Sequence, residues 1–252
     1  MNKKLIKSIV DITCGLGATV SIPFTVTNCA CSQKNNPLPD TVYNIDANNV
    51  LKGFKEGINL SQYDGKCNTM EIPANVTSIN AEAFINDTKD GTTIPPFITK
   101  LIFPKNSNCS SIGMYAFPQS PITFVTLPDS LTTIGDVTFG YCFSLTSINF
   151  PSHLTRLGAG AFQNCTSLTS VTFPSSLMTF SEDAFKDCSK LKYIAWDLPT
   201  NYINIMIKTN AFVNISLTGK VESLNPQITS QQFLDWIKTK GGFPTTGWDI
   251  AN

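Results

Sequence analysis

The sequence predicts an α/β-type solenoid of about six turns, each 23 residues long. Three residue types recur in the middle of the chain at that interval: phenylalanine at 139, 162 and 185, cysteine at 142, 165 and 188, and proline at 128, 151 and 174. A short apolar alternation before each proline is typical of a strand. With such a period, no unit buries its apolar side alone, so the units must stack.

Each unit is expected to hold one short parallel β-strand and one return segment. In the unit that starts at Leu145, Ile148 and Phe150 alternate with polar residues, and Pro151 ends the strand because proline cannot donate to the ladder. The apolar residues that follow have a spacing that predicts a short helical or 3₁₀ turn against the strand layer. Weaker copies of the unit extend this prediction to residues 67–214.

The unit L-x-x-I-x-F-P-x-x-L-x-x-I-G-x-x-A-F-x-x-C resembles the BspA-like leucine-rich repeat of bacterial and protozoan surface proteins. The resemblance is most specific in the turns that start at Phe124, Leu145 and Leu168, whereas the first two turns lack the cysteine and the last carries an insertion. It implies a leucine-rich-repeat solenoid displayed outside the cell for adhesion or for binding a host protein. It does not imply catalysis.

Residues 1–28 are predicted to be a lipoprotein signal peptide. A basic start precedes an apolar run over 9–26, which ends in Val-Thr-Asn-Cys-Ala-Cys and resembles a bacterial lipobox. Cys29 is the predicted lipidation site, with Cys31 as the alternative. Plain secretion and an uncleaved membrane anchor are the competing interpretations. Asp11 counts against an anchor, because an aspartate at the bilayer centre costs about 2.5–3.5 kcal/mol.

Both ends of the solenoid are expected to carry other structure. Residues 29–66 are assigned to a tether, rich in Asn and Pro over 34–40, and an N-terminal cap. Residues 215–252 are assigned to a C-terminal cap with one short amphipathic helix, for which Ser230 is the candidate N-cap. Covering the open end of the solenoid is the predicted role of this helix, and binding a partner is the alternative.

Cys142, Cys165 and Cys188 hold the same place in successive repeats and are predicted to be reduced, buried and stacked. Three cysteines in line cannot surround a tetrahedral metal, and the chain has a single histidine. We therefore expect no metal site and no cofactor. Cys67 and Cys109 lie outside the pattern, and a disulfide between them is left open.

Composition and charge exclude several function classes. The 18 Lys and Arg residues balance 18 Asp and Glu residues, so no net field attracts nucleic acid. Only 14% of residues are charged and 42% are hydrophobic, which excludes a largely disordered chain. A lone histidine and the absence of a phosphate-binding glycine motif give no support to an enzyme.

Alternation along the strands predicts which side chains point outward. Most of the expected outward residues are small and polar. The exceptions are Lys100, Ile102, Phe124 and Tyr193, which we predict to form a binding strip. The alternative is that the flanking segments 85–98 and 197–209 fold over these four residues and bury them.

These observations together favour a cell-surface lipoprotein, held by its N-terminal lipid on the extracellular face of the bacterial membrane. Its solenoid is expected to bind a host or other extracellular protein, or another macromolecule. The competing hypothesis is a structural or antigenic coat protein without a specific ligand. The sequence leaves the ligand and the oligomeric state open.

Overall fold

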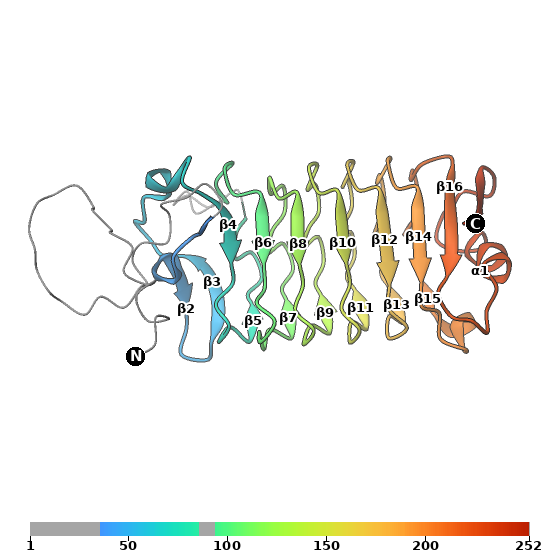
Figure 1. Cartoon of the computed structure of the whole chain (residues 1–252), viewed down its shortest axis with the longest axis horizontal. Helices are drawn as coiled ribbons and strands as arrows, with labels where there is room; N and C mark the ends of the chain where they lie inside the picture. The colour runs from blue at the N-terminus through green and yellow to red at the C-terminus, as the bar shows by residue number, and fades with distance from the viewer. Residues whose placement is uncertain (1–35, 86–93, 252) are drawn as a thin grey trace, which may run out of the picture.

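The computed structural model describes residues 36–85 and 94–251. The predicted signal peptide and both candidate lipidation sites, Cys29 and Cys31, lie outside these residues. The chain winds into a solenoid whose turns follow one another along the long axis (Figure 1). In its described part, one strand of each turn joins a nine-stranded sheet and a second, shorter strand joins an eight-stranded sheet.

The nine-stranded sheet is parallel throughout. Its strands, in spatial order, are β1 (Asn36–Pro37), β4 (Cys67–Glu71), β6 (Lys100–Ile102), β8 (Phe124–Thr126), β10 (Ser147–Asn149), β12 (Ser170–Phe173), β14 (Tyr193–Trp196), β16 (Gly219–Ser223) and β17 (Trp248–Ile250). The sheet extends beyond residue 214, since β16 pairs with β14 and adds a seventh turn to the expected six. That turn lacks the proline and cysteine by which the repeat is recognised.

The eight-stranded sheet is formed by the return segments. Its strands, in chain order, are β2 (Tyr43–Ile45), β3 (Val50–Phe54), β5 (Ser78–Ile79), β7 (Ser111–Ile112), β9 (Thr133–Ile134), β11 (Arg156–Leu157), β13 (Thr179–Phe180) and β15 (Met206–Ile207). The return segments of the central turns are two-residue strands followed by turns, in place of the expected helical or 3₁₀ turns. The reason is that their amides bond across to the preceding turn, as Gly158 N does to Ile134 O at 2.9 Å.

The core consists of columns that run along the solenoid axis. The first column holds one inward residue from each strand of the nine-stranded sheet between β4 and β16, namely Met70, Leu101, Val125, Ile148, Val171, Ile194 and Val221, all of them buried. A second column is a stack of phenylalanine rings, one per turn, with centroids 5.2–5.7 Å apart; its members are Phe84, Phe117, Phe139, Phe162, Phe185 and Phe212. Phe54 and Phe243 close the two ends of this stack edge-on. Apolar burial in these columns is therefore shared between neighbouring turns.

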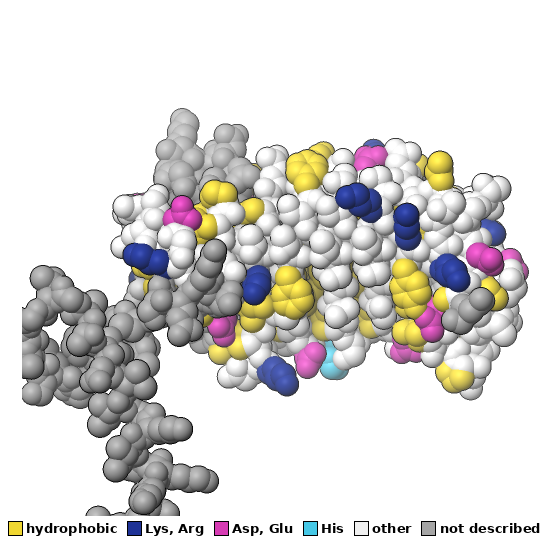
Figure 2. Space-filling model, turned by 45° about the horizontal axis from the view of Figure 1, so that its top comes forward, with side chains coloured by type: hydrophobic (Ala, Val, Ile, Leu, Met, Phe, Trp, Pro, Cys, Tyr) yellow, Lys and Arg dark blue, Asp and Glu magenta, His cyan; other side chains and the backbone are white. Residues whose placement is uncertain are grey.

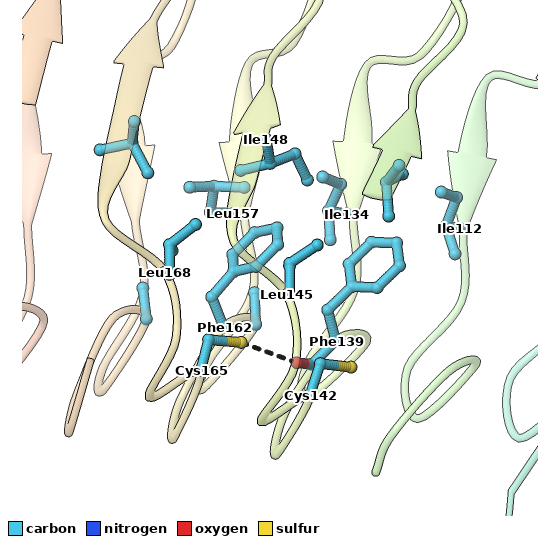
Figure 3. Close-up of a cluster of buried hydrophobic side chains, with 14 of the residues drawn as sticks. Ile112, Ile134, Phe139, Cys142, Leu145, Ile148, Leu157, Phe162, Cys165 and Leu168 are labelled. Carbon is cyan, nitrogen blue, oxygen red and sulfur yellow. Dashed lines mark hydrogen bonds between the residues drawn. The ribbon is translucent and has the colours of Figure 1, made fainter. Parts of the chain in front are cut away.

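The predicted cysteine column is confirmed: Cys142, Cys165 and Cys188 are buried and free. Each thiol also donates a hydrogen bond to a phenylalanine carbonyl of the preceding turn, over 3.1–3.3 Å. Figure 3 shows one of them, from Cys165 to Phe139. The thiol thus fills a narrow space and satisfies a buried acceptor. Cys109 is free and Cys67 is disulfide-bonded, so the two do not pair with each other.

Each turn reverses direction through residues with left-handed backbone. One column of positive φ comprises Glu82, Tyr115, Val137, Gly160, Asp183 and Asn210. Val137, at φ 50°, is unusual because β-branched residues rarely adopt this conformation. Neighbouring turns also approach each other too closely for a side chain at Gly158, where a Cβ atom would lie 2.4 Å from the carbonyl carbon of Gly135. The glycine that recurs in the repeat unit at 113, 135 and 158 is thus a requirement of stacking.

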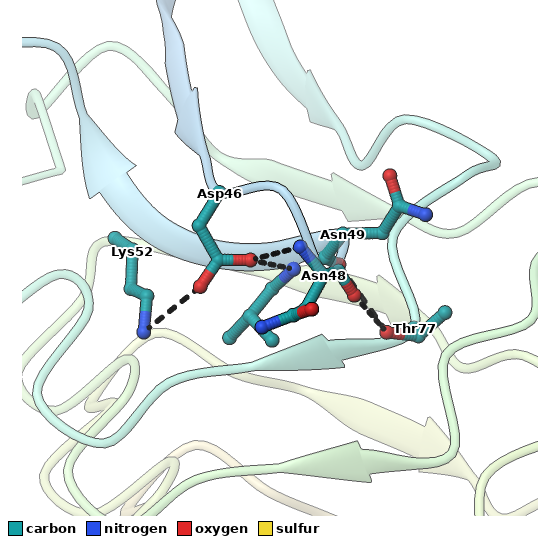
Figure 4. Close-up of polar contacts among 6 residues, drawn as sticks. Asp46, Asn48, Asn49, Lys52 and Thr77 are labelled. Atoms are coloured by element: carbon teal, nitrogen blue, oxygen red, sulfur yellow. Dashed lines mark hydrogen bonds and ion pairs between the residues drawn. The ribbon is translucent and has the colours of Figure 1, made fainter.

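The N-terminal cap is a hairpin formed by β2 and β3, which pair antiparallel while β3 continues parallel to β5. Its turn is held by Asp46, whose Oδ1 accepts from the amides of Asn48 and Val50 and whose Oδ2 lies 3.3 Å from Lys52 Nζ (Figure 4). These contacts, led by the Val50 amide, lower the pKa of Asp46. Thr77 Oγ1 then joins the turn to the first repeat by donating to the carbonyl of Asn48.

The C-terminal cap contains the expected helix, α1 (Ser230–Ile237), which buries Phe233, Leu234 and Ile237. Its N-cap is Thr229, one residue before the predicted Ser230. Thr229 and Gln232 form a reciprocal capping box, whereas Ser230 Oγ accepts from the amide of Ser223. The helix covers the end of the core, where Phe233 meets the ring of Trp196 edge-on at 6.0 Å.

Candidate functional site

The outward side of the nine-stranded sheet, here called the sheet face, carries two rows of side chains. The strand register places the first row, in spatial order, at Thr69, Lys100, Phe124, Ser147, Ser170, Tyr193 and Lys220. The second row is Glu71, Ile102, Thr126, Asn149, Thr172, Ala195 and Glu222. The residues between the rows are the buried column of the core, as the alternation predicts, but two members of the rows, Thr69 and Ala195, are buried as well, at 7% and 3% exposure.

The four residues of the predicted strip lie on this face but not side by side. Lys100 and Phe124 are register neighbours, and Ile102 is in the second row next to them. Tyr193 is in the first row, separated from Phe124 by Ser147 and Ser170. The strip is therefore two groups divided by two strands of small residues.

Exposure differs among these residues. Phe124 leaves 44% of its surface open to solvent, which is high for an aromatic side chain on a sheet. Lys100, Ile102 and Tyr193 are half-buried. The hydroxyl of Tyr193 donates to Glu222 Oε2, which fixes the position of its ring. Two segments, 85–98 and 197–209, are expected to cover the strip. Residues 86–93 of the first lie outside the described residues. The described parts of both segments leave Phe124 exposed.

The middle of the sheet face is uncharged. The outward residues of β8, β10, β12 and β14 are aromatic, hydroxyl, amide or methyl side chains, and Figure 2 shows a mostly white surface with separate hydrophobic and basic spots. Ser147, Asn149, Ser170 and Thr172 make no side-chain hydrogen bond within the described part of the chain, although Thr126 Oγ1 accepts from Phe103 N. These polar groups are free to bind a ligand.

Two residues of these turns were missed by sequence reasoning, Lys220 on the sheet face and Phe143 outside the strip. Lys220 lies beside Tyr193 because β16 continues the sheet, and the alternation Lys220-Val221-Glu222 is the signal that could have revealed this strand. Phe143, in the turn before β10, is 54% exposed and contacts Tyr141 edge-on at 6.2 Å. Its repeat equivalents are Thr166 and Ser189, so this aromatic side chain stands out in the alignment of the units.

The described residues hold neither a metal-ligand cluster nor an activated thiol. Over 36–85 and 94–251, no three or more His, Cys, Asp or Glu side chains are grouped as metal ligands. None of the helices in this part of the chain has the length and apolar character that a membrane crossing requires. Burial raises the pKa of the Cys109 thiol to about 12 and raises that of Cys142 as well, so neither is an activated nucleophile.

The fold and its repeated columns define a leucine-rich-repeat solenoid, and the comparison with protein families specifies its type. The profile described as "BspA type Leucine rich repeat region" matches residues 110–235 in six copies. The chain belongs to this BspA-type leucine-rich repeat family. The comparison with curated proteins gave no match.

Solved structures share the fold. The pneumococcal vaccine antigen PcpA superimposes with a TM-score of 0.61 at 15% identity, over 82% of this chain and 46% of PcpA. A leucine-rich repeat protein of T. pallidum gives 0.54 at 21% identity, over 75% of this chain and 86% of the other. A leucine-rich cell surface protein of Faecalibacterium prausnitzii gives 0.51 at 24% identity, over 65% and 39%. This chain therefore spans less than half of PcpA and of the F. prausnitzii protein.

Proposed function

We propose that this protein is a cell-surface binding module whose sheet face contacts an extracellular protein or other macromolecule. The observation that carries the proposal is Phe124, a large apolar side chain left 44% exposed on a face whose other members are mostly small or polar. An exposed aromatic group gains free energy when a partner covers it. Membership of the BspA-type family and the similarity in fold to a cell surface protein of F. prausnitzii support display outside the cell.

We further propose that a lipid on Cys29, or alternatively on Cys31, anchors the protein to the outer side of the bacterial membrane. The lipobox-like sequence supports this anchor. Labelling with radioactive palmitate tests it: wild type should incorporate label, and Cys29→Ser should lose both label and membrane association. Label that disappears only in Cys31→Ser moves the site by two residues. An unlabelled wild type refutes the lipid anchor.

Binding is tested with the full-length protein, purified in detergent and immobilised, against panels of extracellular proteins and glycans. Saturable binding that Phe124→Ser with Tyr193→Ser weakens at least tenfold supports the proposal; tenfold corresponds to about 1.4 kcal/mol. The melting temperature should stay within a few degrees, because both residues lie on the outward face. A double variant that unfolds would instead place these residues in the core. If no member of either panel binds saturably, the coat-protein hypothesis is favoured.

A further inference from the structure

The two aromatic residues of the first row have a defined separation. Phe124 and Tyr193 are three strand spacings apart in a continuous parallel register. At about 4.8 Å per spacing, their Cα atoms are separated by roughly 14 Å along the solenoid axis. Ser147 and Ser170 lie between them and are too small to block a ligand that spans both rings.

The size of this surface limits what it can bind. The strands are three to four residues wide on the sheet face, which is about 10 Å, and Lys100 and Lys220 are five spacings or about 24 Å apart. The surface between them therefore measures about 240 Å² in projection. A stable interface with a folded protein buries about 800 Å² on each partner. A folded protein would therefore have to contact the flanking turns as well, whereas a linear chain laid across the strands fits the strip itself.

The chemistry of the strip distinguishes among linear chains. A polyanion requires a basic stripe, but the four central strands carry no outward charge, and Glu222 and Asp249 lie close to Lys220. An extended peptide would add to a sheet edge through its backbone, and the sheet face presents side chains only. A sugar ring, by contrast, has an apolar C–H face for an aromatic ring and a rim of hydroxyls. Ser147, Asn149, Ser170 and Thr172 offer that rim free donors and acceptors.

We propose that the strip between Lys100 and Lys220 binds a linear, uncharged oligosaccharide that crosses the strands and stacks on Phe124 and Tyr193. The bond from the Tyr193 hydroxyl to Glu222 holds one ring in place before the ligand arrives, which reduces the entropy lost on binding. The inference rests on the proposed binding function and names the class of ligand at the same surface.

The experiment measures binding of the full-length protein to neutral linear oligosaccharides of increasing length from the cello, laminari, xylo and chito series. A heparin-derived oligosaccharide is the anionic probe. We expect affinity for one neutral series to rise steeply once the chain is long enough to reach both rings. Phe124→Ala and Tyr193→Ala should each weaken it at least tenfold and remove the dependence on length. Tyr193→Phe should weaken binding less than Tyr193→Ala does, because the ring remains while its bond to Glu222 is lost.

The matched control is Phe143→Ala, which removes another exposed ring outside the strip and should leave affinity unchanged. Failure of every neutral series to bind overturns the glycan inference, and so does binding of heparin alone or an equal effect of Phe143→Ala. If a protein from the panel above binds saturably in that case, the proposed binding function stands without the glycan. If neither glycan nor protein binds, both are refuted.

Discussion

Replacing Phe162 with alanine tests the inward column of the solenoid. The ring is fully buried and contacts three others: it stacks on Phe139 at 5.4 Å and on Phe185 at 5.3 Å, and it meets Phe150 edge-on at 5.5 Å. Truncating a buried phenylalanine costs about 3–5 kcal/mol. Each aromatic pair adds about 0.5–1.5 kcal/mol beyond its buried area, which places this site in the upper part of that range, at about 4–5 kcal/mol.

The assay is urea unfolding followed by far-ultraviolet circular dichroism, with the free energy obtained by linear extrapolation. Phe143→Ala is the matched control, because it makes the same chemical change at a ring that is 54% exposed, and it should shift stability by less than about 0.5 kcal/mol. If the unfolding free energy of Phe162→Ala depends less steeply on urea concentration than that of wild type, the adjoining turns unfold independently of the rest, as nearest-neighbour coupling predicts. A loss below about 1 kcal/mol would refute the assignment of the inward face.

Three further predictions concern stability. Val137→Asn should stabilise the protein by about 1 kcal/mol in urea unfolding, because asparagine tolerates the positive φ that strains valine; a destabilised variant would contradict this. Tyr43→Phe should be neutral or stabilising in the same assay, because the buried Tyr43 hydroxyl makes no hydrogen bond to residues 36–85 or 94–251, and a loss above about 1 kcal/mol would reveal a partner. Stability should fall as pH rises above about 8.5, where an unfolded thiol ionises while Cys109, with a folded pKa of about 12, stays protonated; the unfolded state then binds fewer protons. The urea midpoints measured at about pH 7.5 and about pH 9.5 should differ less in Cys109→Val than in wild type. An equal difference in both proteins would show that Cys109 does not cause the pH dependence.

Prediction from the sequence succeeded where a residue's role repeats with the period. The columns of Ile148, Phe162 and Cys165 are visible in the sequence because each turn places the same residue type in the same environment. It failed for the return segments because a local apolar spacing was interpreted as a helical turn. Inter-turn hydrogen bonds decide that conformation, and they join residues one period apart, such as Gly158 and Ile134.

The ends of the solenoid were harder to predict for a related reason. A terminal unit has a neighbour on one side only, so its sequence reflects capping in place of the repeat. The hairpin around Asp46 departs from the repeat, since its turn is stabilised by local side-chain bonds and its strands are antiparallel. At the other end, β16 has the buried apolar residue of the repeat, Val221, but not the proline that follows the strand in other turns. The repeat pattern therefore did not reveal this strand, and Lys220 was not included in the predicted strip.

The candidate site was predicted from alternation alone, and the structure adds what alternation cannot give, namely the distance between residues in different turns. The repeat also supplies an internal comparison. Ser147 and Ser170 hold the position of Phe124 in the next two turns, and the sheet folds there with a hydroxymethyl side chain. Packing therefore does not require an aromatic ring at this position. A phenylalanine that remains 44% exposed contributes little to the core, and it keeps apolar area available for a partner. The stacked columns maintain the fold on the inner side, so the outward rows can change from turn to turn at little cost in stability, and a binding surface can arise there by substitution of a few residues.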